Sequence, residues 1–115
     1  MIQRFDTGPR MSKMIIHNGV AYLAGQVPQD ASADIAGQTG QVLHAIDDLL
    51  QRAATDKAHI LRADIFLADM ADFDGMNEVW EKWVPQGAAP ARATVQAKLA
   101  RSNLKIEIVI IAAVP

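Results

Sequence analysis

One carboxylate of the chain, Glu107, stands inside an apolar run, between Ile106 and Ile108. Burying a carboxylate is costly unless it is paired or hydrogen-bonded, so a glutamate kept in such a place is a candidate for chemistry. The alternative is a surface glutamate that pairs with Lys105 or with a cross-strand Lys98. The residues alone leave both interpretations open.

One guanidinium, that of Arg92, is the second candidate. It follows Pro90-Ala91 at the start of a predicted strand, in line with Thr94 and Gln96 on alternate positions. A planar guanidinium can grip a carboxylate with two parallel hydrogen bonds, so Arg92 is a candidate anion clamp. The alternative is a solvated arginine on an edge strand, and it also stays open.

Other kinds of site find little support in the sequence. The histidines at 17, 44 and 59 show no metal-ligand spacing, and the chain has no Cys. Gly37-x-x-Gly40 lies inside a predicted helix and follows no strand, so it is not a phosphate cradle. No serine has evident His and Asp partners for a catalytic triad. We therefore expect neither a metal nor a cofactor.

Length and composition narrow the class of protein. The 115 residues fit a single domain over residues 1–115. Half of them are hydrophobic (50%), which is more apolar surface than one small core easily holds and favours oligomerisation. The net charge of −2 and the scattered Lys and Arg lack the clustered cationic footprint of a nucleic-acid-binding protein. Neither a signal peptide nor a membrane span is visible, so we expect a cytoplasmic protein.

The elements that position the two candidates follow from hydrophobic periodicity and turn signals. Asn18-Gly19 between two apolar runs predicts a hairpin, after a weak first strand at Ile2 to Phe5. The remaining elements are a helix over Asp34–Ala54, a strand over Ile60–Ala68, a helix over Phe73–Val84, and strands over Arg92–Leu99 and Leu104–Val114.

Three aspartates are assigned to these helices. Asp47 and Asp48 are interpreted as a solvated pair on an exposed face of the first helix, and Asp72 is interpreted as the N-cap of the second.

The predicted order is β-β-β-α-β-α-β-β, an α+β domain with one sheet and both helices on one face. The last strand is apolar on both of its faces: one face carries Ile106, Ile108 and Ile110, and the other carries Val109 and Ile111 beyond Glu107. A strand that is apolar on both faces is buried on both. With the helices on one side, we expect the other side to meet another subunit.

The chain resembles the RidA/YjgF family. The resemblance rests on Ala89–Gln96 followed by Leu104–Ile108, which match the Pro-x-Arg opening and the Ile-Glu-Ile strand of that family's C-terminal signature. It continues through Ala24–Pro28, Ile65–Asp69 and Asp72–Asn77, and so covers nearly the whole chain. The closest branch is the divergent YoaB-like one, whose members share the features at 16–18 and at Trp80-x-x-Trp83.

The resemblance implies a chorismate-mutase-like fold (bacillus type) with a mixed sheet, assembled as a homotrimer with clefts between subunits. It also implies hydrolysis of a reactive enamine or imine, such as 2-aminoacrylate, to a 2-keto acid and ammonia. In that chemistry the residue matching Arg92 binds the substrate carboxylate, and the one matching Glu107 positions or activates the attacking water. Backbone N–H groups near Gly25 and Ala93 and the side chain of Asn77 would complete the substrate pocket.

Three positions depart from the family pattern. Ala24 stands where active deaminases of the family usually have Ser, and Met11 falls near the position of a Tyr that lines the family's pocket. Thr94 replaces a Cys that is common in the family. The clamp and the glutamate remain, but the pocket is more apolar. A non-catalytic trimer that binds a small carboxylate is therefore the main alternative to a deaminase. An RNA-acting protein is a third hypothesis, against which the acidic charge balance argues.

Overall fold

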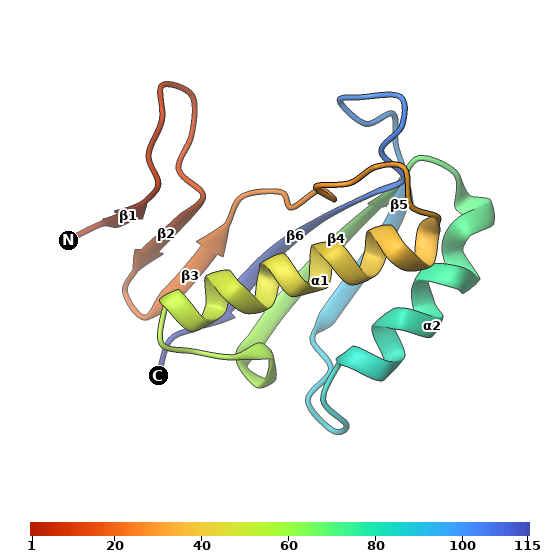
Figure 1. Ribbon diagram of the computed structural model, residues 1–115. Coiled ribbons are helices and arrows are strands. Elements are labelled where there is room, and N and C mark those ends of the chain that lie inside the picture. The colour runs from red at the N-terminus through yellow and green to blue at the C-terminus, as the bar shows by residue number, and fades with distance from the viewer.

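Six strands form one sheet and two helices lie across one of its faces in the computed structural model, which describes all residues from 1 to 115 (Figure 1). The strands run in the order β1-β2-β3-β6-β4-β5, with β4 and β5 parallel and all other neighbours antiparallel. The sheet is therefore mixed, as expected. The elements are β1 (Gln3–Phe5), β2 (Met14–His17), β3 (Val20–Leu23), α1 (Ile35–Arg52), β4 (Ile60–Leu67), α2 (Phe73–Trp83), β5 (Ala91–Gln96) and β6 (Ile106–Ala113).

The hairpin between β2 and β3 turns at the predicted dipeptide. Asn18 has φ of 52° and Gly19 has φ of 75°, and His17 pairs with Val20. Two residues in the left-handed region between paired strands make a type I′ turn, which matches the twist of the flanking strands. This local signal sets the register of the first half of the sheet.

Helix α1 begins at a capping aspartate and packs its buried face against the sheet. The Asp34 side chain accepts a hydrogen bond from the N–H of Gly37 at 2.9 Å, as an N-cap should. The prediction for Asp47 is wrong, because its carboxylate accepts a 2.9 Å hydrogen bond from Trp83 Nε1 and is only half-exposed. Asp48 alone is on the exposed side, next to His44.

Helix α2 starts differently from the sequence prediction. Asp72 occupies the N-cap position but makes no capping hydrogen bond with its side chain. Asp69 does the capping one turn earlier, where it accepts from the N–H of Ala71 at the head of a short 3₁₀ turn. Farther along α2, a side chain on Gly75 would meet Ile35 Cγ2 at 2.8 Å, so this glycine lets the two helices approach closely.

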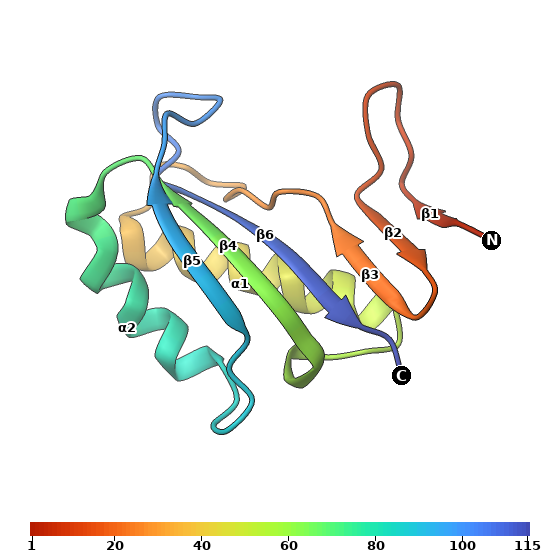
Figure 2. The same cartoon turned by 180° about the vertical axis from the view of Figure 1, so that it is seen from behind.

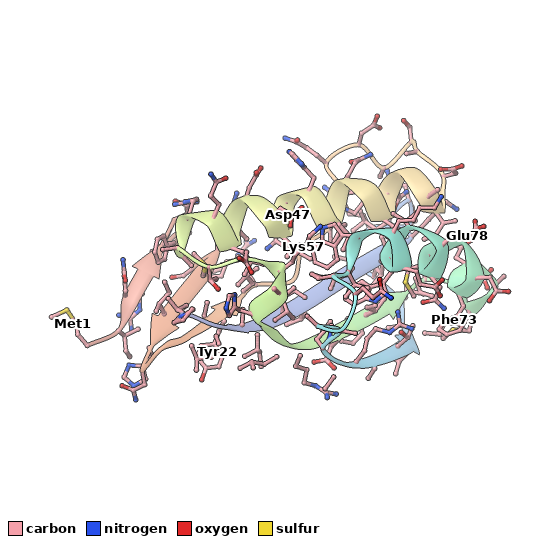
Figure 3. All side chains as sticks on the ribbon, turned by 90° about the horizontal axis from the view of Figure 1, so that it is seen from below. Met1, Tyr22, Asp47, Lys57, Phe73 and Glu78 are labelled. Carbon is pink, nitrogen blue, oxygen red and sulfur yellow. The ribbon has the colours of Figure 1, made fainter.

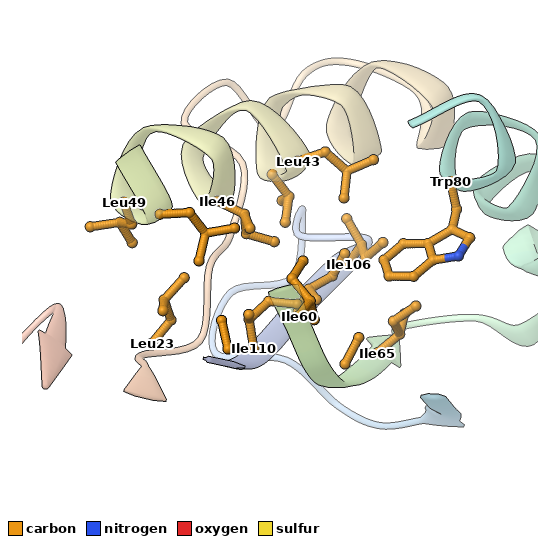
Figure 4. Close-up of a cluster of buried hydrophobic side chains, with 14 of the residues drawn as sticks. Leu23, Leu43, Ile46, Leu49, Ile60, Ile65, Trp80, Ile106 and Ile110 are labelled. Atoms are coloured by element: carbon orange, nitrogen blue, oxygen red, sulfur yellow. The ribbon is translucent and has the colours of Figure 1, made fainter. Parts of the chain in front are cut away.

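The core lies between the sheet and the two helices (Figure 4). On β6 the even-numbered residues Ile106 to Ala112 face it and are fully buried, while the odd-numbered ones face away. Figure 2 shows the other face of the sheet with no helix in front of it. Tyr22 points to this side (Figure 3) and is 46% exposed, and Val95 is 47% exposed. We call this surface the bare face. On it, β4 and β6 carry apolar Phe66, Val109 and Ile111 beside Glu107 and the Arg62–Asp64 ion pair. Neither helix is both long and apolar enough to cross a lipid bilayer.

Candidate functional site

Arg92 lies on β5, the edge strand, and reaches across it to α2. It pairs with Ala63 of β4, which is fully buried, so its side chain is on the helix-covered face. Its Nη1 donates a 2.8 Å hydrogen bond to Asn77 Oδ1, and its Cζ lies 5.4 Å from the centroid of the Trp80 ring. Arg92 is half-buried and makes no ion pair. It is therefore not a freely solvated edge arginine but a braced cation without a countercharge.

The neighbours of Arg92 on β5 alternate between the two faces. Thr94 shares the helix-covered face, and its Oγ1 is buried without a hydrogen-bond partner. Ala93 faces the bare side. Because the N–H of Ala97 donates to Leu67 O on β4, the N–H groups of Arg92 and Thr94 point to the free edge of the sheet, while that of Ala93 faces β4. The unpaired backbone donors at Arg92 are thus those of the even-numbered residues, not that of Ala93.

Glu107 lies on the bare face of β6. It pairs with Phe66 of β4 and makes neither an ion pair nor a side-chain hydrogen bond within the chain, so neither Lys105 nor Lys98 is its partner. The carboxylate packs directly on Gly25, because a Cβ added to this glycine would collide with it and come within 2.8 Å of Glu107 Cδ. Gly25 itself donates no backbone hydrogen bond. A half-buried, unpartnered carboxylate and a free N–H therefore lie side by side.

The two candidate groups do not meet within one chain. Arg92 is on the helix-covered face of β5, Glu107 is on the bare face of β6, and β4 lies between them. Met11, 53% exposed, is in the loop between β1 and β2, on the opposite side of the sheet from β5. Ala24 adjoins Gly25 and accepts a hydrogen bond from the side chain of Gln26. The predicted residues thus form one cluster around Arg92 and Asn77 and another around Glu107 and Gly25.

None of the cavities of the single chain is lined by Arg92 or Glu107. The largest, about 520 Å³, lies between α1 and the segment after β3, where Lys13 and Gln29 line it. A second, about 470 Å³, lies under the loop between β5 and β6. A third, about 330 Å³, adjoins the first. A pocket that contains both candidate groups would therefore need a second chain.

The contact between the Trp80 ring and Arg92 was not predicted from the sequence. Asn77 and Trp80 were predicted to share one helix face, and residues three apart on α2 do so. The missing information was that β5 pairs with β4 in the register that puts Arg92 above this face. No motif around Trp80 indicates that register.

Comparison with known proteins gives consistent matches over the whole chain. The family model described as Endoribonuclease L-PSP matches residues 1–114. A curated "RutC family protein" from Haemophilus ducreyi is 51% identical over 114 residues, covering 99% of this chain and 97% of its own length. The "RutC family protein YoaB" of Escherichia coli is 46% identical over 113 residues, covering 98% of each chain.

Solved structures agree with the sequence matches. A Neisseria meningitidis structure, described as a member of the YjgF protein family, superposes with a TM-score of 0.97 at 44% identity and covers 100% of this chain and 96% of its own. A more distant curated relative carries the name of an activity. It is the "Reactive Intermediate Deaminase A, chloroplastic" of Arabidopsis thaliana, 33% identical over 103 residues, which cover 90% of this chain and 54% of the relative.

Proposed function

Because the chain belongs to the Endoribonuclease L-PSP family, with RutC- and YjgF-type relatives, we propose that it hydrolyses a reactive 2-imino or 2-enamino acid to a 2-keto acid and ammonia. The family resemblance and the α+β fold expected from the sequence are confirmed by these matches. The activity is proposed because a distant relative is named for it and because the two charged groups suit it. The observation that carries the proposal is the half-buried Arg92, which has a hydrogen-bonding brace but no countercharge.

Arg92 serves as the clamp for the substrate carboxylate. A guanidinium forms two parallel hydrogen bonds with a carboxylate, which fixes both the position and the plane of the attached carbon. In a 2-imino acid that carbon adjoins the C=N bond, so the clamp also orients the electrophile. Thr94 lies on the same face two residues along the strand, and its hydroxyl oxygen is buried without a hydrogen-bond partner.

Glu107 activates the attacking water. Its carboxylate accepts a proton from water as the oxygen bonds to the imine carbon, and the electron pair of the C=N bond passes to nitrogen. The nitrogen then takes up the proton held by Glu107 and the hydroxyl proton of the adduct, and it leaves as ammonia as the C=O bond of the 2-keto acid forms. A 2-enamino acid first tautomerises to the 2-imino acid and then follows the same steps. The unpaired N–H of Gly25 is a donor for the oxygen atom beside the same carboxylate.

The complete site forms between two protomers of a homotrimer. Within one chain the clamp and the glutamate lie on opposite faces of the sheet, so a single substrate cannot touch both. The bare face carries exposed Tyr22 and Val95 beside partly buried Val109 and Ile111, a surface that burial against another chain would stabilise. In this proposal, Glu107 on the bare face of one protomer completes the site of Arg92 on the edge strand of the next.

The decisive experiment measures keto-acid release from enzymatically generated 2-aminoacrylate and 2-iminobutanoate. The wild type is expected to accelerate release over buffer, whereas Arg92→Ala and Glu107→Gln are each expected to be inactive. If the two variants are co-assembled in equal amounts, random mixing places an intact Arg92 beside an intact Glu107 in about one quarter of the sites. About one quarter of the wild-type activity should therefore return.

The outcomes of that mixture separate the parts of the proposal. No recovery after verified subunit exchange would mean that both residues act within one protomer, or that they do not act together. A folded wild type that accelerates the hydrolysis of none of the imines would rule out the deaminase activity. Sedimentation or light scattering of the wild type tests the trimer independently of any substrate.

A carboxylate-binding protein without turnover is the second candidate. It is favoured by Ala24 beside Gly25 and by Met11, which leave the pocket without two groups found in active deaminases. It predicts binding of 2-oxobutanoate in calorimetry together with no keto-acid release from any imine. Restoring the hydroxyl by Ala24→Ser separates the two candidates, because it should raise turnover only in an enzyme. Cleavage of RNA is not supported, because the net charge is −2 and the cations are scattered.

A further inference from the structure

The aromatic ring beneath Arg92 belongs to the protein core rather than to an open pocket. Trp80 is only 5% exposed, yet the centroid of its ring lies 5.4 Å from Arg92 Cζ. A cation over an indole face at this distance is attracted by the ring quadrupole, and the attraction grows as water is excluded. Trp80 thus contacts the guanidinium from the side that a ligand cannot reach.

The ring is itself held by two helices. Its neighbour on α2, Trp83, lies with its ring centroid 5.4 Å away and its plane tilted by 49°. Trp83 Nε1 donates to Asp47 Oδ2 on α1 at 2.9 Å, and Lys57 Nζ lies 5.3 Å from the centroid of the Trp83 ring. The platform under Arg92 is therefore tied to α1, which packs on the centre of the sheet.

The braces leave one edge of the guanidinium free. A guanidinium has five N–H donors, and Arg92 uses one from Nη1 on Asn77 Oδ1. No other hydrogen bond from Arg92 is formed within the chain, so the edge made by Nε and Nη2 keeps its parallel pair of donors. That edge is the one that a carboxylate can grip side-on with two bonds.

We propose that Trp80 is a positioning residue, which fixes the Arg92 guanidinium so that its Nε–Nη2 edge is presented to the ligand carboxylate. This inference rests on the proposed function, in which that carboxylate is the anchor of the substrate. An arginine side chain that is already ordered loses less rotamer freedom when a ligand binds. Removing the ring face therefore weakens binding although no group that touches the ligand is lost.

A measurement without any ligand tests the geometry. In a ¹H–¹⁵N spectrum of the wild type, the ring current of Trp80 should move the Hε signal of Arg92 away from its random-coil position. The signal should return toward that position in Trp80→Leu and stay largely shifted in Trp80→Phe, which keeps an aromatic face. A wild-type signal at the random-coil position, unchanged in Trp80→Leu, would overturn the inference whether or not any ligand binds.

Calorimetry with 2-oxobutanoate tests the consequence. Trp80→Leu should weaken binding by about 2- to 30-fold, the range of a cation–π contact, and Trp80→Phe should recover most of the loss. Phe73→Leu is the matched control, because it removes an aromatic ring that packs on the core from the same helix and makes no cation–π contact with Arg92. It should lower the melting temperature yet leave the affinity within about twofold.

The possible results keep the two proposals apart. Equal weakening by Phe73→Leu and Trp80→Leu would mean general loosening of α2 and would overturn the positioning role. A wild type that does not bind 2-oxobutanoate would contradict the proposed function, and the Arg92 Hε signal would still decide the role of Trp80. If Trp80→Leu does not fold, the wild-type Arg92 Hε signal alone decides the geometry, because a signal at the random-coil position would overturn the inference.

Discussion

Two arginines of this chain are braced in similar ways, and the difference between them is the ground on which Arg92 is proposed as the functional one. Arg52 and Arg92 each have Cζ 5.4 Å from the centroid of an aromatic ring, that of Phe5 and that of Trp80. Arg52 also donates to both oxygens of Asp6, at 2.8 and 3.0 Å, whereas Arg92 donates to a neutral amide. The charge of Arg52 is therefore neutralised inside the chain, and that of Arg92 is not.

The contrast is sharper because of burial. Arg52 is exposed, where water would solvate a lone cation at little cost, yet it has a carboxylate partner. Arg92 is half-buried, where an uncompensated charge costs more, and yet it has none. A half-buried cation without a countercharge is therefore a candidate binding site for an anion from outside the chain. Arg52 fastens the first strand to α1, whereas Arg92 keeps the free charge that the proposed ligand would need.

The largest effect should come from removing each arginine in turn. Arg92→Ala is expected to lower the affinity for 2-oxobutanoate by about 30-fold to several thousand-fold, the loss typical of a buried charged partner. Arg52→Ala should leave the affinity unchanged and lower the melting temperature. Calorimetry and thermal unfolding of both variants check the pair of outcomes. If Arg52→Ala weakens binding as much as Arg92→Ala does, the distinction between the two arginines is lost.

A smaller effect should come from making Arg92 resemble Arg52. Asn77→Asp replaces the neutral brace by a carboxylate of nearly the same shape, which pairs with Arg92 and competes with the ligand. We expect the affinity for 2-oxobutanoate to fall by about 10- to 100-fold without loss of stability. Asn77→Ser is the matched control, since it removes the brace without adding charge and should cost less affinity. Equal losses in the two variants would show that countercharge is not the deciding property.

The partner of Arg92 in the proposed chemistry depends on one glycine. A side chain on Gly25 would push Glu107 away, so Gly25→Ala should lower keto-acid release by about 10-fold or more while the affinity for 2-oxobutanoate changes little. Gly40→Ala is the matched control, because nothing lies within 4 Å of its added side chain on an exposed turn of α1. It should stabilise the protein by about 0.5–1 kcal/mol and leave the activity intact. Full activity in Gly25→Ala would remove Glu107 from the mechanism.

The sequence predicts the parts of the fold that depend on local rules. Asn18-Gly19 gives the hairpin because the turn itself demands residues that tolerate positive φ. The alternation in β6 gives its two faces, and with them the bare face of the sheet, because side chains on a strand alternate strictly. Arg92 and Glu107 stand out because charged residues inside apolar strands are expensive.

Long-range pairing limits what the sequence can predict about the site. Arg92 and Glu107 lie on opposite faces because β4 pairs with β5 and with β6 in particular registers, which no local pattern fixes. Asp47 looks solvated in the sequence because its partner, Trp83, comes from another helix 36 residues along the chain. Asp72 has the right residue type for a cap, but Asp69 starts a turn before it and takes that role.

The smallest effect should appear in the pH dependence of folding stability, to which the Asp6–Arg52 pair contributes. Hydrogen bonds from Arg52 hold the pKa of the Asp6 carboxyl below its ordinary value, and the same pair raises the pKa of Arg52. Because the Asp6 pKa is lower in the folded state, its contribution to stability is present above the unfolded value, near pH 4, and is lost as the pH falls through the folded value. Hydrogen bonds from Ser32 to Asp30, and from His59 to Asp56, lower those pKa values in the same direction.

Thermal unfolding of Asp6→Asn between pH 7 and pH 2 isolates this contribution. The variant should melt slightly below the wild type at pH 7. The two curves should begin to converge below about pH 4 and should meet once the pH has fallen through the lowered pKa of Asp6. Glu81→Gln removes an exposed carboxylate that makes no ion pair and should show no such convergence. A constant difference between Asp6→Asn and the wild type down to pH 2 would mean that the charge of Asp6 does not fasten Arg52. The two arginines would then differ in burial alone, and the missing countercharge would no longer single out Arg92.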